Sequence, residues 1–275
     1  MKRFQKILIV SLVFAMAMFS FSGAGLAKDK ACTTKDLNEQ LVLVTVWMQA
    51  SAEYRALCYQ AFNLGRMNLD NFIANYKGKK PIAIIVDADE TVIDNSAYEA
   101  WLIGKDFGYS SKTWEPWMAA AEATAIPGAK KFLNYAASKG VEVFYVTNRK
   151  MIGYDGTFKN LKALGFPNVD KKHLLLRTKS SDKQARRDIV NKDYAVALLM
   201  GDNLNDFESV FGSNSMEQRF AATDNVEDKW GTKYIVFPNP TYGAWVGAVY
   251  NGNWGASAAE KDKMRKAALT IWNKK

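Results

Sequence analysis

The sequence predicts an α/β fold built on a parallel sheet with helices on both faces. Short apolar runs alternate along the chain with helix-like segments, and polar residues follow most of these runs. The runs occupy residues 82–86, 141–147, 174–176, 196–200 and 234–237. Unbroken apolar runs of this length are typical of strands buried on both faces, and their alternation with helices predicts a parallel sheet.

Residues 1–27 have the layout of a cleavable secretory signal peptide. Lys2, Arg3 and Lys6 precede an apolar stretch, and small residues lead up to Ala27. The apolar stretch is shorter than the run of about 18 residues that a membrane span needs. We therefore expect cleavage after Ala27, export to the periplasm or the medium, and no stable membrane span in the mature chain.

The mature chain carries a mild positive charge that does not predict binding to a nucleic acid polymer. Removing residues 1–27 lowers the formal net charge from +9 to +6, because three basic residues and no acid are lost. The remaining cations alternate with acids, as in residues 227–229 and 260–263. Nucleic-acid binding requires cations that cluster on one face, so we interpret these charges as a solvated surface.

Residues 28–80 are predicted to form a helical region that is part of an accessory lobe, ahead of a core over residues 81–275. From Leu37 to Leu64, apolar residues recur at the three- and four-residue spacing of a helix. This region could pack on its own core or on a second subunit, so a homodimer is an open alternative.

Two further local features complete the sequence pattern. Residues 129–138 are helix-like, and Gly140 follows them as a helix terminator. After export, Cys32 and Cys58 would meet an oxidising compartment, and the sequence leaves open whether they form a disulfide.

Two acids follow the first apolar run. Asp87 and Asp89 are expected to face the same side, because alternate side chains of an extended chain share a face. Two such carboxylates repel each other unless a cation or a shared proton lies between them. Acids that cap a following helix would give the same pattern, so this motif alone leaves both interpretations open.

Polar groups also accompany the later runs. Thr147 and Asn148 end the second run and could donate to phosphate oxygens, although Thr-Asn also suits a turn. Lys183 could neutralise phosphate charge or lie on the surface, and Asp202 and Asp206 could bind one cation or cap a helix. Ligands of parallel α/β sheets bind beyond the carboxyl ends of the strands, where these side chains are expected to meet.

Taken together and in this order, the four signals resemble the haloacid dehalogenase (HAD) superfamily. The resemblance rests on Asp-x-Asp-x-Thr at residues 87–91, then a threonine, a lysine and paired acids. It implies that Asp87 is the nucleophile and becomes an aspartyl phosphate, while Asp89 acts as general acid and then as general base. It also implies that Mg²⁺ is bound by Asp87, the Asp89 main-chain carbonyl and Asp202, with Asp206 in support, and that the phosphoryl group is held by Thr147, Asn148 and Lys183.

Two longer stretches, residues 85–98 and 199–207, are similar to the paired signatures of bacterial class C acid phosphatases. That family includes outer-membrane lipoproteins that act as 5′-nucleotidases, and the similarity extends over nearly all of the mature chain. It implies an exported phosphomonoesterase whose substrates are small phosphomonoesters, including nucleoside monophosphates. The sequence departs from the lipoproteins before Cys32, where Asp29, Lys30 and Ala31 are unlike a lipoprotein cleavage site, so no lipid anchor is expected.

The same resemblance implies a small, mainly helical cap lobe, inserted around residues 96–126, that covers the site. Trp114 in this insertion and Tyr242 after the last run look like the pair that stacks on a nucleoside base. Because the chain contains 8 Trp and 12 Tyr, core packing is the competing interpretation for either ring.

His173 is the only histidine, which disfavours phosphatases that use a phosphohistidine, histidine-based triads and H-E-x-x-H zinc hydrolases. Two alternatives to a hydrolase stay open. One is a phosphotransferase in which an alcohol replaces water as acceptor, and the other is an exported binding protein, because a fold alone does not imply activity.

Overall fold

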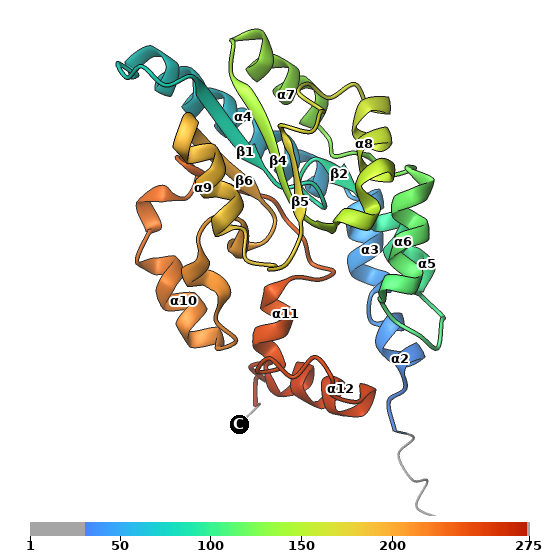
Figure 1. The fold of residues 1–275 in the computed structure, drawn as a ribbon. Helices are drawn as coiled ribbons and strands as arrows, with labels where there is room; N and C mark the ends of the chain where they lie inside the picture. The colour runs from blue at the N-terminus through green and yellow to red at the C-terminus, as the bar shows by residue number, and fades with distance from the viewer. Residues whose placement is uncertain (1–30, 274–275) are drawn as a thin grey trace, which may run out of the picture. The chain divides into compact units, whose positions relative to one another are not determined.

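A computed structural model describes residues 31–273, so the predicted signal peptide lies outside the described residues (Figure 1). The predicted parallel sheet is present, with the strand order β5-β4-β1-β6-β7. Every neighbouring pair in this sheet is parallel. Its strands are β1 (Ile82–Val86), β4 (Glu142–Lys150), β5 (Leu174–Arg177), β6 (Ala195–Gly201) and β7 (Tyr234–Val236).

A hydrophobic core lies on each face of the sheet, as the unbroken apolar runs predict. Ile84 and Val86 pack with residues of α4 (Ala52–Asn75) and α7 (Ala129–Ser138) on one face. Ile85 packs with Val190 of α9 (Gln184–Asp193) on the other face. Successive side chains of a strand point to opposite faces, so both cores draw on the same five-residue strand.

Helix boundaries in the N-terminal region differ from the continuous helical pattern seen in the sequence. The region folds as α2 (Thr34–Glu39), α3 (Val42–Ala50) and α4. The backbone of Ser51 is extended, at φ −85° and ψ 138°, and its side chain accepts a hydrogen bond from the Tyr54 N–H at 3.0 Å. A serine cap therefore starts a new helix although the apolar spacing continues across it. Downstream, α7 has the predicted bounds, and Gly140 follows it with φ +75°.

The segment between β1 and α7 forms the insertion. It contains β2 (Ile93–Asp94), α5 (Ser96–Leu102), α6 (Ser111–Ala120) and β3 (Thr124–Ala125). The short strands β2 and β3 pair antiparallel and close the insertion at its base. From α3, Gln49 donates to the Ser96 hydroxyl at the start of α5, at 3.2 Å. Figure 1 shows α2 and α3 beside α5 and α6, whereas α4 covers the sheet.

The remaining helices are α8 (Tyr154–Ala163), α10 (Met216–Asp224), α11 (Ala244–Val249) and α12 (Ala258–Ala267). The C-terminal helix α12 returns to the N-terminal region, because Gln40 donates to Asp262 at 2.8 Å and accepts from Arg265 at 2.8 Å. Contacts between the two ends of the described chain thus join α12 to α2.

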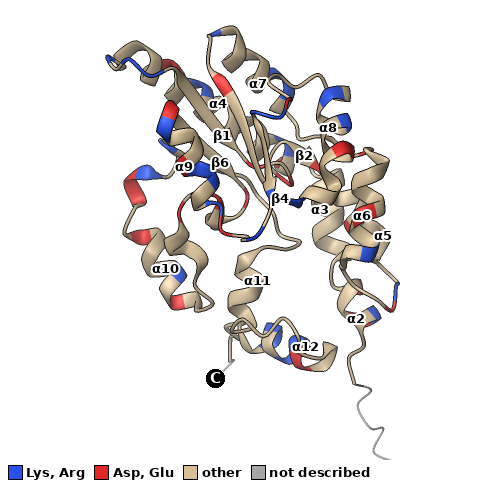
Figure 2. Cartoon of the chain, in the orientation of Figure 1, with Lys and Arg blue, Asp and Glu red and all other residues tan. Residues whose placement is uncertain are grey.

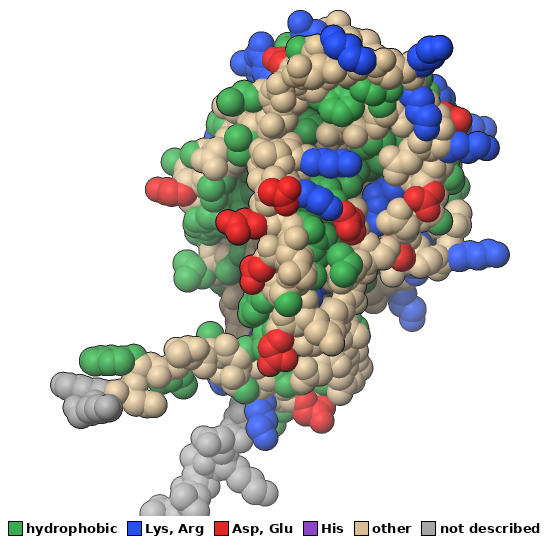
Figure 3. Space-filling view, turned by 90° about the vertical axis from the view of Figure 1, so that its left-hand side faces the viewer, with side chains coloured by type: hydrophobic (Ala, Val, Ile, Leu, Met, Phe, Trp, Pro, Cys, Tyr) green, Lys and Arg blue, Asp and Glu red, His purple; other side chains and the backbone are tan. Residues whose placement is uncertain are grey.

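Charged residues of both signs lie along the outer helices (Figure 2), and their side chains alternate with neutral and hydrophobic ones in the space-filling view (Figure 3). Among residues 31–273, no helix combines the length and the apolar character that a bilayer span requires. Cys58 is buried and carries a free thiol, so the disulfide that the sequence left open is not formed in the described part of the chain.

Candidate active site

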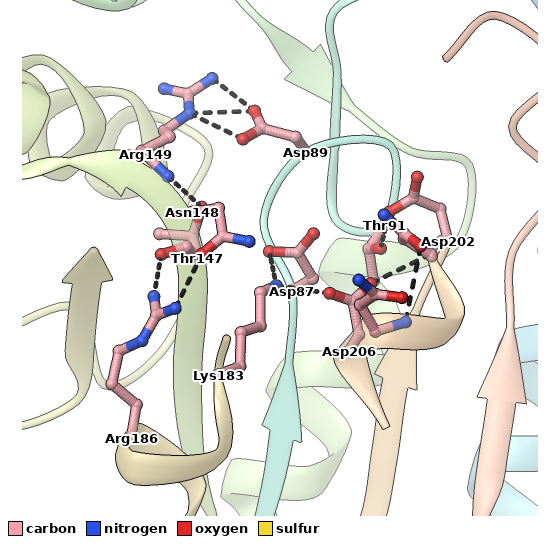
Figure 4. A network of polar contacts seen from close by, with 12 residues as sticks. Asp87, Asp89, Thr91, Thr147, Asn148, Arg149, Lys183, Arg186, Asp202 and Asp206 are labelled. Carbon is pink, nitrogen blue, oxygen red and sulfur yellow. Dashed lines mark hydrogen bonds and ion pairs between the residues drawn. The ribbon is translucent and has the colours of Figure 1, made fainter. Parts of the chain in front are cut away.

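The predicted catalytic, phosphate-binding and metal-binding residues gather at the carboxyl edge of the sheet (Figure 4). Asp87 comes directly after β1, Thr147 and Asn148 lie in the last part of β4, and Asp202 comes directly after β6. Lys183 is the N-cap residue of α9. The topology therefore joins residues that are more than 100 positions apart in the chain.

Lys183 links two of the acids. Its Nζ atom lies 2.6 Å from Asp87 Oδ1 and 2.7 Å from Asp206 Oδ1, and the lysine side chain is only 2% exposed. Burial disfavours the charged form, but Asp206 and Asp87 outweigh this effect and raise the pKa of Lys183. A permanent buried cation therefore stands beside the predicted nucleophile.

Three carboxylates converge at this point. Asp87, Asp202 and Asp206 each offer an oxygen, and these oxygens lie within 4.8 Å of one another. Asp206 is held in place by the Asn203 N–H, which donates to its Oδ2 at 3.0 Å. A Cβ atom on Gly201 would lie 2.4 Å from the same Oδ2, so only glycine leaves room for this acid.

The protonation equilibria of these acids reflect their crowding. Burial raises the pKa of Asp87 to about 7, although Lys183 opposes the shift, and Asp206 and Asp89 add to it. Burial also raises the pKa of Asp202 well above its usual range, with Asp206 and Asp87 contributing. A set of crowded carboxylate oxygens suits a hard divalent cation, which takes oxygen ligands and would relieve the repulsion. The residues present thus fit a divalent metal.

Asp202 is tied to neighbouring elements by two further side chains. The Asn239 amide donates to its Oδ2 at 2.9 Å, and the Thr91 hydroxyl donates to its Oδ1 at 3.4 Å. Asn239 lies just beyond β7, so the fifth strand of the sheet also contributes to the site.

The Asp89 carboxylate faces a buried arginine rather than the acidic group. Arg149 donates to Asp89 through Nε at 2.9 Å and pairs with it through a terminal nitrogen at 2.8 Å. The Asn95 amide donates to the same carboxylate at 2.8 Å. The Trp117 indole in turn donates to the Asn95 side-chain carbonyl at 2.8 Å, which connects Asp89 to α6 of the insertion.

A second arginine orients the predicted phosphate ligands. Arg186 donates to the Thr147 main-chain carbonyl and, at 2.7 Å, to the Asn148 side-chain carbonyl. Because its carbonyl is engaged, Asn148 presents its amide N–H groups as donors. The Thr147 hydroxyl accepts from the Arg149 main-chain N–H at 3.1 Å and retains its own proton for donation.

The two predicted stacking residues lie in different surroundings. Trp114 is covered on one side by Arg149, whose guanidinium carbon lies 5.4 Å from the ring centroid, and the Tyr98 ring packs against it in a T-shaped arrangement with centroids 4.9 Å apart. Tyr242 lies on the loop after β7, where its N–H donates to Asn239 at 3.4 Å. Within residues 31–273, no ring contact joins Trp114 to Tyr242.

Several residues of this network were not singled out from the sequence. Each contacts a predicted site residue, and they are Asn95, Arg149, Arg186 and Asn239. Helical spacing could have found Arg186, which lies three residues after Lys183. His173 lies at the start of β5, the opposite end of the strand from the site, where it contacts Glu142 and Asp170. The structure therefore keeps His173 outside the site.

Comparison with known proteins identifies the family. Residues 25–245 match the family model described as HAD superfamily, subfamily IIIB (acid phosphatase). The chain belongs to this family. It is also similar to the class C acid phosphatase from Bacillus anthracis, at 40% sequence identity and a TM-score of 0.83, over 86% of this chain and 99% of that one. The structure of that enzyme with tungstate bound matches at the same identity and coverage, with a TM-score of 0.82.

Membership in the acid phosphatase family makes the chain a phosphomonoester hydrolase. Its site offers a carboxylate beside a buried ammonium, an acidic group fit for a divalent metal, and polar donors at the end of β4. These are the components that phosphoryl transfer requires, because such catalysis depends mainly on positioning and on stabilisation of charge.

Proposed function

We propose that this chain is an exported acid phosphatase that hydrolyses nucleoside 5′-monophosphates and other small phosphomonoesters with Mg²⁺. The observation that carries the proposal is the position of Lys183, whose ammonium group pairs with Asp87 and Asp206 next to Asp202. A cation there can attract the phosphoryl group of a substrate to the carboxylate that attacks it.

In the first half of the reaction, an Asp87 carboxylate oxygen attacks phosphorus. The bond between phosphorus and the leaving-group oxygen breaks, and Asp89 gives that oxygen its proton. Lys183, Asn148 and the Thr147 hydroxyl hold the phosphoryl oxygens as their charge increases. The product is an alcohol and an aspartyl phosphate on Asp87.

In the second half, water attacks phosphorus and gives a proton to Asp89. The bond between Asp87 and phosphorus breaks, which releases inorganic phosphate and returns Asp87 to its carboxylate form. Asp89 ends the cycle protonated, as it began, so protons balance over the two steps.

Asp87, Asp202 and Asp206 are the side chains that would hold Mg²⁺, together with the Asp89 main-chain carbonyl predicted from the sequence. When bound, Mg²⁺ supplies positive charge that offsets the repulsion between an anionic phosphate and the Asp87 carboxylate. The three acids favour this interpretation because their oxygens lie within 4.8 Å of one another, while Lys183 pairs with only two of them, Asp87 and Asp206.

The proposed substrate class depends on two aromatic residues, Trp114 in the insertion and Tyr242 after β7. Trp114 lies over Arg149 next to the leaving-group acid, and Tyr242 lies on the loop that Asn239 fixes to Asp202. Stacking of a base on an aromatic ring contributes about 1–3 kcal/mol. The solved relative with tungstate supports recognition of a tetrahedral oxyanion, since tungstate has the shape of phosphate.

The test is a panel of nucleoside monophosphates and sugar phosphates, assayed with and without a chelator. We expect nucleotides to have the higher kcat/KM, and Tyr242→Leu to raise their KM about tenfold while Tyr242→Phe, which keeps the ring, does not. Equal kcat/KM values for nucleotides and sugar phosphates would contradict the substrate assignment, and full activity after chelation would contradict the metal.

Asp87→Asn serves as the control for the catalytic assignment, because it keeps the shape of the side chain and removes the nucleophile. We expect no turnover above background and no radiolabelled phosphoenzyme after an acid quench, whereas the parent protein retains label.

Export is tested by N-terminal sequencing of the protein from the periplasm or the medium, which should begin at Lys28.

A further inference from the structure

A small cavity lies next to the predicted phosphate ligand Asn148. Its volume is about 130 Å³, and its walls come from the insertion and from the ends of two strands. Because about 10–15 Å³ of such space is enough to hold one water molecule, the cavity has room for a phosphate group. The lining includes Tyr109, Trp114, Glu115, Lys150 and Arg177.

Two cations stand side by side in this cavity. Lys150 ends β4 and Arg177 ends β5, and the two are register partners in the parallel sheet. Like charges on adjacent strands destabilise a sheet unless something of opposite charge lies near them. The arrangement therefore favours an anion.

No carboxylate of the described chain neutralises this pair through an ion pair. Lys150 donates to the Ser111 hydroxyl at 2.8 Å, which is a neutral partner. Arg177 has no ion-pair partner among residues 31–273, and Glu115, which also lines the cavity, pairs with neither cation. Arg177 lies close enough to Arg186 to contribute to lowering the pKa of Arg186, after the larger effect of that residue's own burial. The cavity thus has a positive potential.

The cavity also lies on the leaving-group side of the site. Thr147 and Lys150 are three residues apart on one strand, which corresponds to roughly 10 Å. Partial desolvation raises the pKa of Tyr109, Arg177 lowers it and Asp89 raises it, so this phenol is within electrostatic reach of both the cavity cation and the predicted leaving-group acid. Trp114, which lies over Arg149, forms part of the same wall.

We propose that Lys150 and Arg177 form a subsite for a second anionic group on the leaving group, so that bisphosphates are preferred over the matching monophosphates. The subsite rests on the proposed function, because hydrolysis must occur at Asp87. A nucleoside 3′,5′-bisphosphate would place its 5′-phosphate at Asp87, its base on Trp114 and its 3′-phosphate between the two cations.

The test compares kcat/KM for adenosine 3′,5′-bisphosphate and adenosine 5′-monophosphate in the parent protein and in the Lys150→Gln, Arg177→Gln double variant. We expect the parent protein to prefer the bisphosphate about tenfold, as charge-assisted hydrogen bonds to one phosphate group allow. The double variant should lose this preference, and Arg177→Glu should reverse it. Adenosine 3′-monophosphate should be the first product.

Two controls separate this subsite from other causes. Lys131→Gln removes an exposed charge on α7, on the far side of the sheet core, and should keep the preference for the bisphosphate. Glucose 1,6-bisphosphate and glucose 6-phosphate form a pair without a base, so a preference within that pair supports the subsite even if nucleotides are poor substrates. A bisphosphate-to-monophosphate ratio that is near one in the parent protein, or unchanged in the double variant, would overturn the proposal.

Discussion

The Arg149 guanidinium pairs with the Asp89 carboxylate at 2.8 Å, and the arginine side chain is only 1% exposed. The terminal nitrogen that pairs with Asp89 also donates to the Asn95 side-chain carbonyl at 3.1 Å, and the second terminal nitrogen donates to the Thr157 hydroxyl at 3.2 Å. A buried arginine with all its partners in place is rigid, and the Asp89 carboxylate takes its orientation from it. The residue proposed as general acid is therefore positioned by a network that reaches into the insertion.

Arg149→Ala should lower kcat for alkyl phosphates by about 10- to 100-fold, because a misplaced Asp89 delivers its proton less effectively. The loss should be smaller for p-nitrophenyl phosphate, whose leaving group needs less protonation. Arg149→Lys should recover part of the alkyl activity. The measurement is the ratio of kcat values for the two ester types in each variant.

Thr157→Val is the matched control for that comparison, because it removes one Arg149 contact but leaves the contact with Asp89. It should change both esters by the same small factor. If Arg149→Ala reduced aryl and alkyl turnover equally, or changed only KM, positioning of Asp89 would not be the function of this arginine.

Gly201→Ala should reduce kcat by about 100-fold. The added Cβ would lie 2.4 Å from Asp206 Oδ2, so Asp206 must move away from Lys183, and displacements of about 1 Å in a catalytic site have effects of this size. Gly212→Ala is the control, because a Cβ there has its nearest neighbour at 4.0 Å. Steady-state kinetics and circular dichroism of both variants decide whether the loss belongs to the site or to folding.

The strands were predictable from the sequence because a strand buried on both faces must be apolar throughout. Residues 82–86 form β1 with the bounds of the apolar run, and α7 begins and ends as its pattern indicates. Helix boundaries in the N-terminal region were less predictable. The apolar spacing continues past Ser51, and only the serine cap separates α3 from α4.

The acids of the site were also predictable in position, because parallel strands bring their carboxyl ends to one edge. The arginines were less so: Arg149 has no local pattern that distinguishes it from a surface cation, and Arg186 has only its helical spacing from Lys183. Their roles depend on burial, which only the fold reveals. The sequence assigned Asp206 a supporting role at the metal, and its carboxylate lies within 4.8 Å of those of Asp87 and Asp202.

Mg²⁺ should stabilise the metal-free protein through Asp87, Asp202 and Asp206. At a concentration about a hundredfold above its Kd, we expect Tm to rise by about 5–10 °C. Asp202→Asn should raise Tm without metal at neutral pH, because buried Asp202 must take up a proton on folding and asparagine is neutral throughout, and should reduce the rise with Mg²⁺. The new amide oxygen can still accept from Asn239. Differential scanning fluorimetry measures both effects without an activity assay.

Asp193→Asn, at an exposed position in α9, is the control for net charge and should behave like the parent protein. A Mg²⁺-dependent shift that Asp202→Asn leaves intact would place the binding site elsewhere.

Glu99 makes stability depend on pH. It lies in α5 and is 6% exposed, and burial raises the pKa of its carboxyl from 4.5 to about 7. The folded chain therefore holds this proton more tightly than the unfolded chain does. The resulting stabilisation is complete below about pH 4.5 and is lost as the pH rises through 7.

Glu99→Gln should therefore increase Tm by a few degrees at pH 8 and change it little at pH 5, where the glutamic acid is already neutral. Glu122→Gln, at an exposed position in the same insertion, should show no such difference between the two pH values. Thermal melts of the three proteins across pH 5–8 give the comparison, and parallel curves for the parent protein and Glu99→Gln would rule out a buried proton at this position.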